Sequence, residues 1–470
     1  MLWLALFAPK LPFDLLARQG HPPSRPAALL GEEKGIPRLA EVNAAAARRG
    51  LRPGQSLAHA YAVVPELILL RKDEAAERAA FERLGSCALG FSSEVRLAER
   101  AVLLEVGGSL RLFGGLEALG MRLREALEPL AVTLREGVAP TAEAALFLAR
   151  AGGGRILSRE ELKASLAPLR LSAAPLPSEL IATLAALGLD RLGRLFRLPP
   201  ASLSERFGPA LLAWLESLLG ERPPAWPRFT PPERFQAELE LPQPAGSVPE
   251  LRFALARLVH ELEACLSPRR LGVAKLRLTL KGRRSFRDAT IALRSPSAEA
   301  KRLLAAAEAA LERIELSEPV LALALESGSL REIPPLQQTL WGPASEGHRE
   351  KLAELIERLE QRLGEAALYR LGLAEDHRPE RAFRRLPAWP EPQPSKAALP
   401  LSPRPAWFLP SPRPVRREDY ELLSGPERIE SGWWDGEEHR RDYYRARDRQ
   451  GRECWLFQAA EGWFLQGFFR

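Results

Sequence analysis

Basic side chains at alternate positions are the residues of this chain best suited to chemistry, and that chemistry is the binding of phosphate. Apolar residues alternate with Lys275, Arg277, Thr279 and Lys281, and this set is extended along the chain by the basic residues Arg283, Arg284 and Arg287. In a β-strand this period of two places the basic side chains on one face. Like charges on one face repel one another, which favours a phosphate backbone as partner. A solvated strand face is the alternative interpretation.

The composition limits the class of protein. A chain of 470 residues is too long for one core, so we expect about three domains. The net charge of +7 suits a nucleic-acid partner. Cysteines (Cys87, Cys265 and Cys454) and histidines are dispersed, so we expect no disulfide framework, metal site or cofactor. No run approaches the roughly 18–20 apolar residues of a membrane span, and no secretory signal is evident, so a cytoplasmic protein is expected.

The secondary structure that the sequence predicts is clearest around residues 100–115. An apolar run that ends in paired glycines, Gly107 and Gly108, predicts a buried strand beginning at Arg100 and then a tight turn. Helical spacing follows over 116–127, a strand over 131–137 and a helix over 141–151. This alternation predicts βαβ-type units on one sheet. The apolar run Leu2–Phe7 predicts a further strand that is buried on both faces.

This part of the chain resembles the palm of Y-family (UmuC-like) translesion DNA polymerases. Glu105-Val106-Gly107-Gly108 matches the Asp-Val-x-Gly ending of the family's palm strand. The family's four acidic positions, however, fall here on Ala5, Phe7, Arg100 and Ala101. In a strand the Glu99 side chain would face away from Arg100, so only a shift of register would bring it in.

The positions at which this chain differs from the family are those that the family uses for catalysis. Nucleotidyl transfer requires two divalent ions bridged by carboxylates, and the positive charge of Arg100 would repel them. The tyrosine and arginine that hold the incoming triphosphate fall on Ala44 and Ala47. The resemblance therefore implies a catalytically degenerate homologue that is not an enzyme. A weakly active translesion polymerase with rearranged carboxylates is the alternative, and a structural subunit that never touches DNA is a third possibility.

The resemblance implies an α+β multidomain fold with a Y-family palm, fingers, thumb and little finger, plus a small β-rich C-terminal module. The expected boundaries are 1–160 for the palm with the fingers inserted at about 28–70, 165–222 for a helical thumb with a helix–hairpin–helix, and 233–333 for the little finger. A peptide at 334–342, a helix at 346–368, a proline-rich linker at 386–414 and the module at 415–470 follow.

Sequence-independent DNA binding is expected from the thumb and the little finger. The glycines of a helix–hairpin–helix let backbone N–H groups approach a phosphate closely. Arg194 and Arg206 lie in that element. The little finger, the family's extra DNA-gripping domain, contains Lys275, Arg277, Lys281, Arg283 and Arg284.

The peptide at 334–342 resembles the Gln-Leu-x-Leu-Phe pentapeptide by which bacterial polymerases dock on the sliding clamp. Gln337, Leu340 and Trp341 match in type, while Gln338 replaces the usual leucine. An apolar Leu-Trp pair in an exposed linker is costly to leave in water, which favours its insertion into a pocket on a partner.

The C-terminal module narrows the resemblance to a degenerate branch of the family, for which Gly425–Trp434 and Arg441–Tyr444 are characteristic. This branch implies a hub of an inducible (SOS) mutagenesis complex in DNA repair. Its expected partners are the sliding clamp, an error-prone C-family DNA polymerase and a RecA-like accessory protein. Residues 441–447 and 454–458 predict a β-hairpin joined by 448–451. Its aromatics form either a docking surface or the core, and the expected partner-binding set is Trp433, Trp434, Tyr443 and Tyr444.

Overall fold

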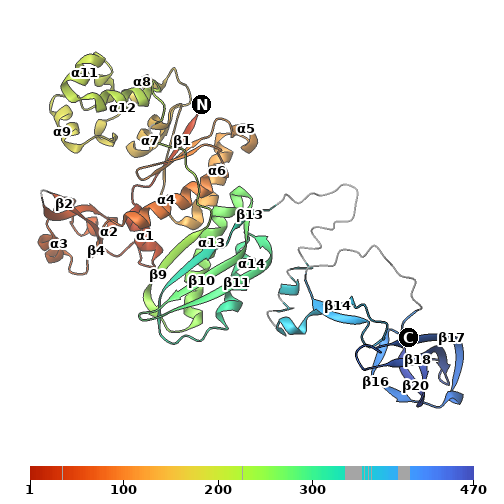
Figure 1. Cartoon of the computed structure of the whole chain (residues 1–470). Coiled ribbons are helices and arrows are strands. Elements are labelled where there is room, and N and C mark those ends of the chain that lie inside the picture. Colours follow the sequence, from red (N-terminus) through yellow and green to blue (C-terminus); the bar gives the residue numbers. More distant parts are fainter. Residues whose placement is uncertain are drawn as a thin grey trace. The chain divides into compact units, whose positions relative to one another are not determined.

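The computed structural model describes residues 1–33, 35–224, 226–333, 352–353, 355–357, 359–360, 363–389 and 403–469. The chain divides into two units, Met1–Gly342 and Pro343–Arg470 (Figure 1). Within the described residues, no helix is long and apolar enough to cross a membrane.

The palm is built on a five-stranded sheet with the order β5-β6-β1-β7-β8. Its strands are β1 (Trp3–Phe7), β5 (Val95–Ala98), β6 (Ala101–Glu105), β7 (Arg135–Ala139) and β8 (Gly154–Arg155). Strand β1 lies between β6 and β7 and is antiparallel to both. The predicted βαβ unit is therefore present in a split form, because β1 separates its two parallel strands. The connection between β6 and β7 contains α5 (Leu110–Phe113) and α6 (Leu116–Leu127).

Both faces of this sheet are covered, as the apolar run of β1 predicted. Leu4 and Leu6 belong to a core cluster with residues of α4 (Glu74–Ala88) and α6. Ala5 belongs to a second cluster with α7 (Ala142–Ala151) and the thumb. A Cβ on Gly137 would lie 2.1 Å from the Ala145 carbonyl oxygen, so a glycine is needed for α7 to pack this closely on β7.

The fingers and thumb extend from the palm. The fingers contain a sheet of order β3-β2-β4, formed by β2 (Ala27–Glu33), β3 (Ile36–Val42) and β4 (Ile68–Leu70), with helices α2 (Ala44–Arg48) and α3 (Leu57–Val63). The thumb is helical, as predicted, and consists of α8 (Leu162–Leu166), α9 (Ser178–Ala186), α10 (Leu192–Leu195), α11 (Pro200–Phe207) and α12 (Pro209–Leu219).

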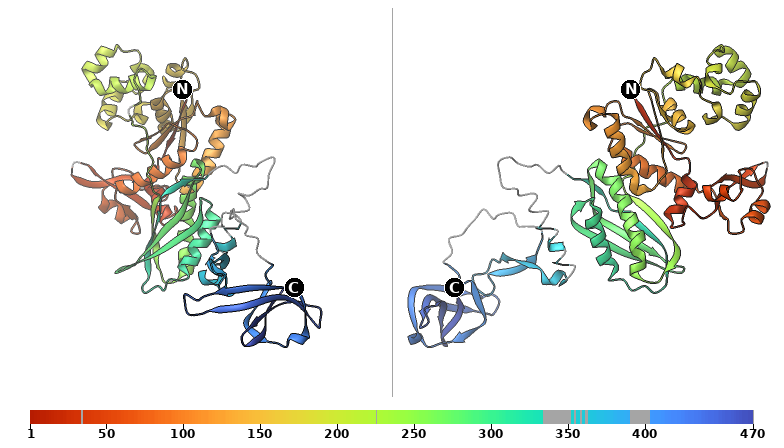
Figure 2. Two further views of the ribbon diagram at one scale, coloured as in Figure 1. Left: turned by 45° about the vertical axis from the view of Figure 1, so that its right-hand side comes forward. Right: turned by 180° about the vertical axis from the view of Figure 1, so that it is seen from behind.

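The little finger is a sheet of order β11-β10-β12-β9, with β13 paired to β10. Its strands are β9 (Gln236–Ala245), β10 (Leu271–Lys281), β11 (Phe286–Ser297), β12 (Val320–Ser327) and β13 (Leu330–Glu332). Helices α13 (Val248–Leu266) and α14 (Ala300–Leu311), drawn in green, cover one face of the sheet (Figure 2). Leu276, Leu278 and Leu280 point into this core, which confirms the predicted period of two in β10.

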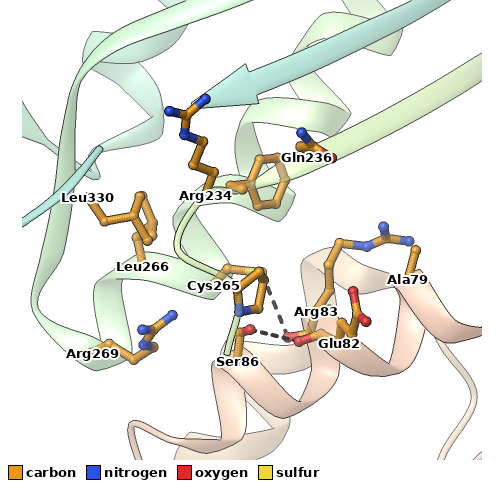
Figure 3. A pocket seen from close by; sticks show the side chains of 12 residues that line it. Ala79, Glu82, Arg83, Ser86, Arg234, Gln236, Cys265, Leu266, Arg269 and Leu330 are labelled. Atoms are coloured by element: carbon orange, nitrogen blue, oxygen red, sulfur yellow. Dashed lines mark hydrogen bonds between the residues drawn. The ribbon is translucent and has the colours of Figure 1, made fainter. Parts of the chain in front are cut away.

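The little finger packs closely on the palm. Figure 3 shows the junction between α4 and the end of α13, where a pocket of about 80 Å³ is lined by Arg83, Cys265 and neighbouring residues. The Cys265 thiol donates a hydrogen bond to the Arg83 carbonyl oxygen at 3.7 Å. Deeper in the interface, the carboxylate of Glu261 on α13 accepts hydrogen bonds from Arg18, at the end of α1 (Leu11–Arg18).

The second unit contains a two-stranded hairpin, β14 (Tyr369–Leu373) with β15 (Phe383–Pro387), and a five-stranded sheet of order β16-β20-β19-β18-β17. The strands of this sheet are β16 (Trp407–Pro414), β17 (Tyr420–Ser431), β18 (His439–Asp448), β19 (Glu453–Ala459) and β20 (Gly462–Phe468). Strands β18 and β19 form the predicted hairpin. In the range 346–368, where the sequence predicts a helix, the described residues between 352 and 360 are helical.

The predicted proline-rich linker at 386–414 is wrong in its last part. Residues 407–414 form β16, which pairs with β20 at Trp407 and at Arg413. The register shifts between these two pairs, where Pro410 and Pro412 stand. Proline cannot donate to a strand ladder, and it is tolerated in β16 because the strand is at the sheet edge and irregular at that point.

Candidate functional site

A cleft of about 1000 Å³ lies where residues of the palm, fingers and thumb meet. Its lining includes Phe7 and Arg100 from the palm, Glu41 from the fingers, and Ser172 from the thumb segment between α8 and α9. Two positions at which the resembling family has carboxylates, Phe7 and Arg100, therefore border this cleft.

The turn between β5 and β6 places Glu99 and Arg100 at the edge of the cleft. Ala98 pairs with Ala101, so the two residues between them form a tight hairpin connection. Arg100 has φ +56°, in the left-handed region. The prediction that a strand begins at Arg100 is therefore wrong: the strand begins one residue later, because an antiparallel hairpin needs a turn there. The argument that Glu99 and Arg100 face opposite sides of a strand no longer applies.

Arg100 is held by an ion pair with the fingers. Its Nη1 lies 2.7 Å from Oε1 of Glu41 on β3, and both side chains are partly buried. The pair connects palm and fingers across the cleft. The charge of the Glu41 carboxylate is thereby balanced by the Arg100 guanidinium. No sequence motif predicts this pair, since the two residues are 59 positions apart.

A second cation borders the same region. The guanidinium of Arg150, on α7, lies 5.5 Å from the centre of the Phe7 ring. Its Nη2 donates a hydrogen bond to the Glu99 carbonyl oxygen at 3.4 Å and lies 4.0 Å from the Glu99 carboxylate. Burial lowers the pKa of Arg150, but an arginine remains charged in proteins. The cleft wall next to Phe7 therefore carries a guanidinium that lies close to the carboxylate of Glu99.

The other two family positions are part of the core. Ala5 and Ala101 are both 0% exposed and belong to one apolar cluster with Leu103. Their methyl groups offer no oxygen ligands. Among the residues that the structure describes, no three His, Cys, Asp or Glu side chains are grouped so that they could hold a metal ion. The residues present at these positions do not fit the pair of ions that the family chemistry requires.

The fingers offer only small side chains where the family holds the triphosphate. The Asn43 side chain caps α2 by accepting a hydrogen bond from the Ala46 backbone N–H at 2.8 Å. In this helix Ala44 is exposed and Ala47 is half-buried, and both end at a methyl group.

The expected DNA-binding residues of the little finger are only partly available for that role. Lys281 forms an ion pair with Glu238 at 2.7 Å, and Arg277 lies 3.9 Å from Glu326. Two cations of the predicted basic face therefore have acidic neighbours, because β9 and β12 bring Glu238 and Glu326 alongside β10. Lys275 and the turn residues Arg283 and Arg284 are exposed.

The thumb residues are exposed as well. Arg194 on α10 donates hydrogen bonds to the Gly188 carbonyl oxygen and to Asp190, the latter at 3.1 Å. Arg206 lies in the last turn of α11. The predicted DNA-binding set thus comes from two separate domains.

The aromatic residues of the C-terminal module divide between surface and core. Trp433 is 76% exposed and Trp434 is 56% exposed. Tyr443 is 1% exposed and is stacked on Trp455 at 4.2 Å, so the prediction that it meets a partner is wrong. Tyr444 is half-buried beside Trp463. The expected clamp-binding residues, Gln337, Leu340 and Trp341, lie outside the described residues.

The succession of palm, fingers, thumb and little finger, with a β-rich module after them, is a Y-family polymerase-like fold, as the sequence predicted. Residues 17–150 match the impB/mucB/samB family. The chain is 29% identical over 459 residues to Protein ImuB of Caulobacter vibrioides, in strain NA1000/CB15N and equally in strain ATCC 19089/CIP 103742/CB 15. Each alignment covers 89% of this chain and 100% of the relative. The expected resemblance to ImuB-type proteins is thereby confirmed.

Similar chains also occur among solved structures. The crystal structure of DinB from Sulfolobus solfataricus is 16% identical, with a TM-score of 0.39, and the insertion ternary complex of Dbh DNA polymerase is 15% identical, with a TM-score of 0.40. Each covers 71% of this chain and 100% of the solved chain.

Proposed function

We propose that this protein is a non-catalytic, Y-family polymerase-like scaffold in DNA damage tolerance and induced mutagenesis. Its similarity to ImuB along most of its length supports this class. The observation that carries the absence of catalysis is the ion pair between Arg100 and Glu41. In this proposal the polymerase fold is retained to bind DNA and partners, and the chemistry is performed by another protein.

The Arg100–Glu41 pair opposes metal binding in two ways. Phosphoryl transfer of this kind uses two cations about 3.5–4 Å apart, which stabilise the attacking and leaving oxygens. The guanidinium places a fixed positive charge where cations would have to gather, and the attraction to Arg100 engages a carboxylate of the cleft, that of Glu41. Ala5 and Ala101 cannot supply replacement ligands.

The scaffold role requires surfaces for DNA and for proteins. For DNA we assign Arg194 and Arg206 in the thumb, together with Lys275, Arg283 and Arg284 in the little finger, whose exposed guanidinium and ammonium groups suit phosphate. The peptide that contains Gln337, Leu340 and Trp341 is assigned to the sliding clamp. The exposed indoles of Trp433 and Trp434, together with the half-buried Tyr444 of the same module, are assigned to an error-prone C-family polymerase and a RecA-like accessory protein.

A weakly active polymerase is the second candidate function. It is favoured by the carboxylates of Glu41 and Glu99, which line the same cleft and would have to act in place of the missing ones. Released from Arg100, Glu41 could serve as a metal ligand.

Primer extension decides between these functions. The full chain is incubated with primed template, all four nucleotides and Mg²⁺ or Mn²⁺, beside the Glu41→Gln plus Glu99→Gln variant as a matched control. We expect no extension by either protein. Ala5→Asp with Arg100→Asp should also remain inactive, because Ala44 and Ala47 still cannot hold the triphosphate. Extension by the wild type that disappears in the Glu41→Gln plus Glu99→Gln variant would establish the weak polymerase instead.

A further inference from the structure

The turn between β10 and β11 in the little finger presents an aromatic ring among arginines. Lys281 pairs with Phe286 at the end of the two strands, and residues 282–285 connect them. Phe286 is 68% exposed. Arg283, Arg284 and Arg287, which surround it in sequence, are exposed too. An exposed phenylalanine is costly in water, so its retention here among cations calls for a ligand with both an apolar face and negative charge.

The turn is held in a defined shape by one carboxylate. Glu318, in the segment before β12, accepts hydrogen bonds from the backbone N–H groups of Arg283, Arg284 and Ser285 and from the Ser285 hydroxyl. These bonds use backbone donors of the turn, so they leave the two arginine side chains directed to the exterior. The turn therefore presents Phe286 and its neighbouring arginines from a fixed position, which lowers the entropy lost on binding.

The charge of this tip differs from that of the sheet behind it. Behind the turn, Lys281 and Arg277 are accompanied by Glu238 and Glu326. On the hairpin itself, from 275 to 292, the one carboxylate is that of Asp288, which accepts a hydrogen bond from the Thr279 hydroxyl at 2.6 Å. At the tip, the three arginines Arg283, Arg284 and Arg287 exceed the nearby carboxylates of Glu318 and Asp288, so an excess of positive charge remains next to the ring of Phe286.

We infer that this tip binds single-stranded DNA, with the Phe286 ring stacked on an unpaired base and Arg283, Arg284 and Arg287 contacting the flanking phosphates. The inference rests on the proposed DNA-binding function and names the form of DNA that this surface takes. Every base has an apolar face that can stack on an aromatic ring, but in a duplex those faces are covered by neighbouring base pairs. A protein partner would have to supply both a pocket for the ring and acidic groups for three arginines, whereas every nucleotide of a single strand supplies a base face and a phosphate together.

The test compares two equally exposed phenylalanines of the same domain. Phe253, on α13, is also 68% exposed, but it lies on the helical side of the sheet. The full chain and its Phe286→Ala and Phe253→Ala variants are titrated into three fluorescent probes of about 12 nucleotides, a length within known single-strand site sizes. The probes are oligothymidylate, an abasic strand of the same length, and a duplex. Fluorescence anisotropy reports the Kd, and unchanged thermal unfolding confirms that both variants are folded.

We expect Phe286→Ala to weaken oligothymidylate binding by at least about fivefold, the lower end of what one stacked base contributes, and to leave the abasic strand and the duplex unchanged. Phe253→Ala should match the wild type on all three probes. Equal oligothymidylate affinities for wild type and Phe286→Ala would overturn the inference while leaving DNA binding intact. An equal loss on the abasic strand would also overturn it, because stacking would not be the cause. A wild-type chain that binds none of the probes would refute the proposed DNA-binding function itself.

Discussion

Arg18 on α1 and Glu261 on α13 form a two-pronged ion pair across the junction between palm and little finger. Arg18 Nε lies 2.5 Å from Glu261 Oε1, and Nη2 lies 2.7 Å from Oε2. The two side chains are 9% and 1% exposed. Arg18 also donates a hydrogen bond to the Glu238 carbonyl oxygen. Arg83 Nε lies 3.6 Å from Oε2 of the Glu261 carboxylate. Two domains that are far apart in sequence are therefore connected by one buried acidic side chain.

Removing that acid should destabilise the first unit strongly. Glu261→Gln leaves Arg18 and Arg83 buried without a charged partner, and breaking a buried pair typically costs about 3–5 kcal/mol. Glu66→Gln is the control, because Glu66 pairs with Arg49 in solvent, where a loss of no more than about 1 kcal/mol is expected. Urea unfolding followed by circular dichroism measures both changes. Equal midpoints for the two variants would show that the buried pair contributes no more than a surface one.

The salt dependence of DNA binding should separate the arginines of the tip from the residues of the strand. Arg283→Gln with Arg284→Gln removes two phosphate contacts, so the slope of log K against log salt should become less steep by roughly 1.4 on single strands. Arg277→Gln with Lys281→Gln should change the slope less, because Glu326 and Glu238 already accompany these cations. Titrations at several salt concentrations give both slopes. If Arg277→Gln with Lys281→Gln changed the slope more than Arg283→Gln with Arg284→Gln, the DNA contact would lie on the open sheet face instead.

The clamp contact should depend on two apolar side chains. If the peptide at 334–342 docks on the clamp, its affinity would come from Leu340 and Trp341 in a pocket. Replacing both with alanine should cost at least about 2–4 kcal/mol, a loss of roughly thirtyfold or more. Gln338→Leu should strengthen binding. Titration of labelled clamp gives the three affinities, and an unchanged affinity of the alanine variant would place the contact elsewhere.

The C-terminal module should tolerate loss of its exposed indoles but not of its buried ring. Trp433→Ala with Trp434→Ala should leave the unfolding temperature nearly unchanged and abolish capture of the error-prone polymerase in a pull-down with purified components. Tyr443→Ala removes a ring stacked on Trp455 and should cost about 3–5 kcal/mol of stability. Polymerase capture that survives the double tryptophan variant would exclude these indoles as the docking site.

Acid should weaken the contact between the 374–382 loop and the C-terminal sheet. Hydrogen bonds from Arg378, whose Nη2 lies 2.6 Å from Asp435, lower the pKa of Asp435 from 3.8 to about 2. A lowered folded-state pKa means that ionised Asp435 stabilises the fold above pH 3.8 and that this contribution is lost as the pH falls towards about 2. Asp435→Asn should therefore lower Tm at about pH 6, with a smaller difference from wild type at about pH 2.5. Calorimetry of both chains tests this, and a constant difference across the range would contradict it.

Much of the fold was predictable because its signals are local. The apolar run of β1 indicated a strand buried on both faces, and the alternation in β10 indicated a sheet with one open face. The turn residues 448–451 marked the hairpin of β18 and β19. Each of these patterns lies within a dozen residues, and backbone geometry converts such a pattern directly into burial.

What only the tertiary structure decided is which charges and rings meet. Arg100 stands beside Glu41 because the turn before β6 and the end of β3 border one cleft, although the two residues are 59 positions apart. Lys281 meets Glu238 through the order of strands in the little finger, which the alternation within β10 does not encode. Tyr443 and Trp434 are both aromatic residues of one module, yet strand register buries the first and a loop exposes the second. Electrostatic pairing and side-chain burial depend on neighbours from distant segments, so residue type and spacing set the candidates and the packing of the chain selects among them.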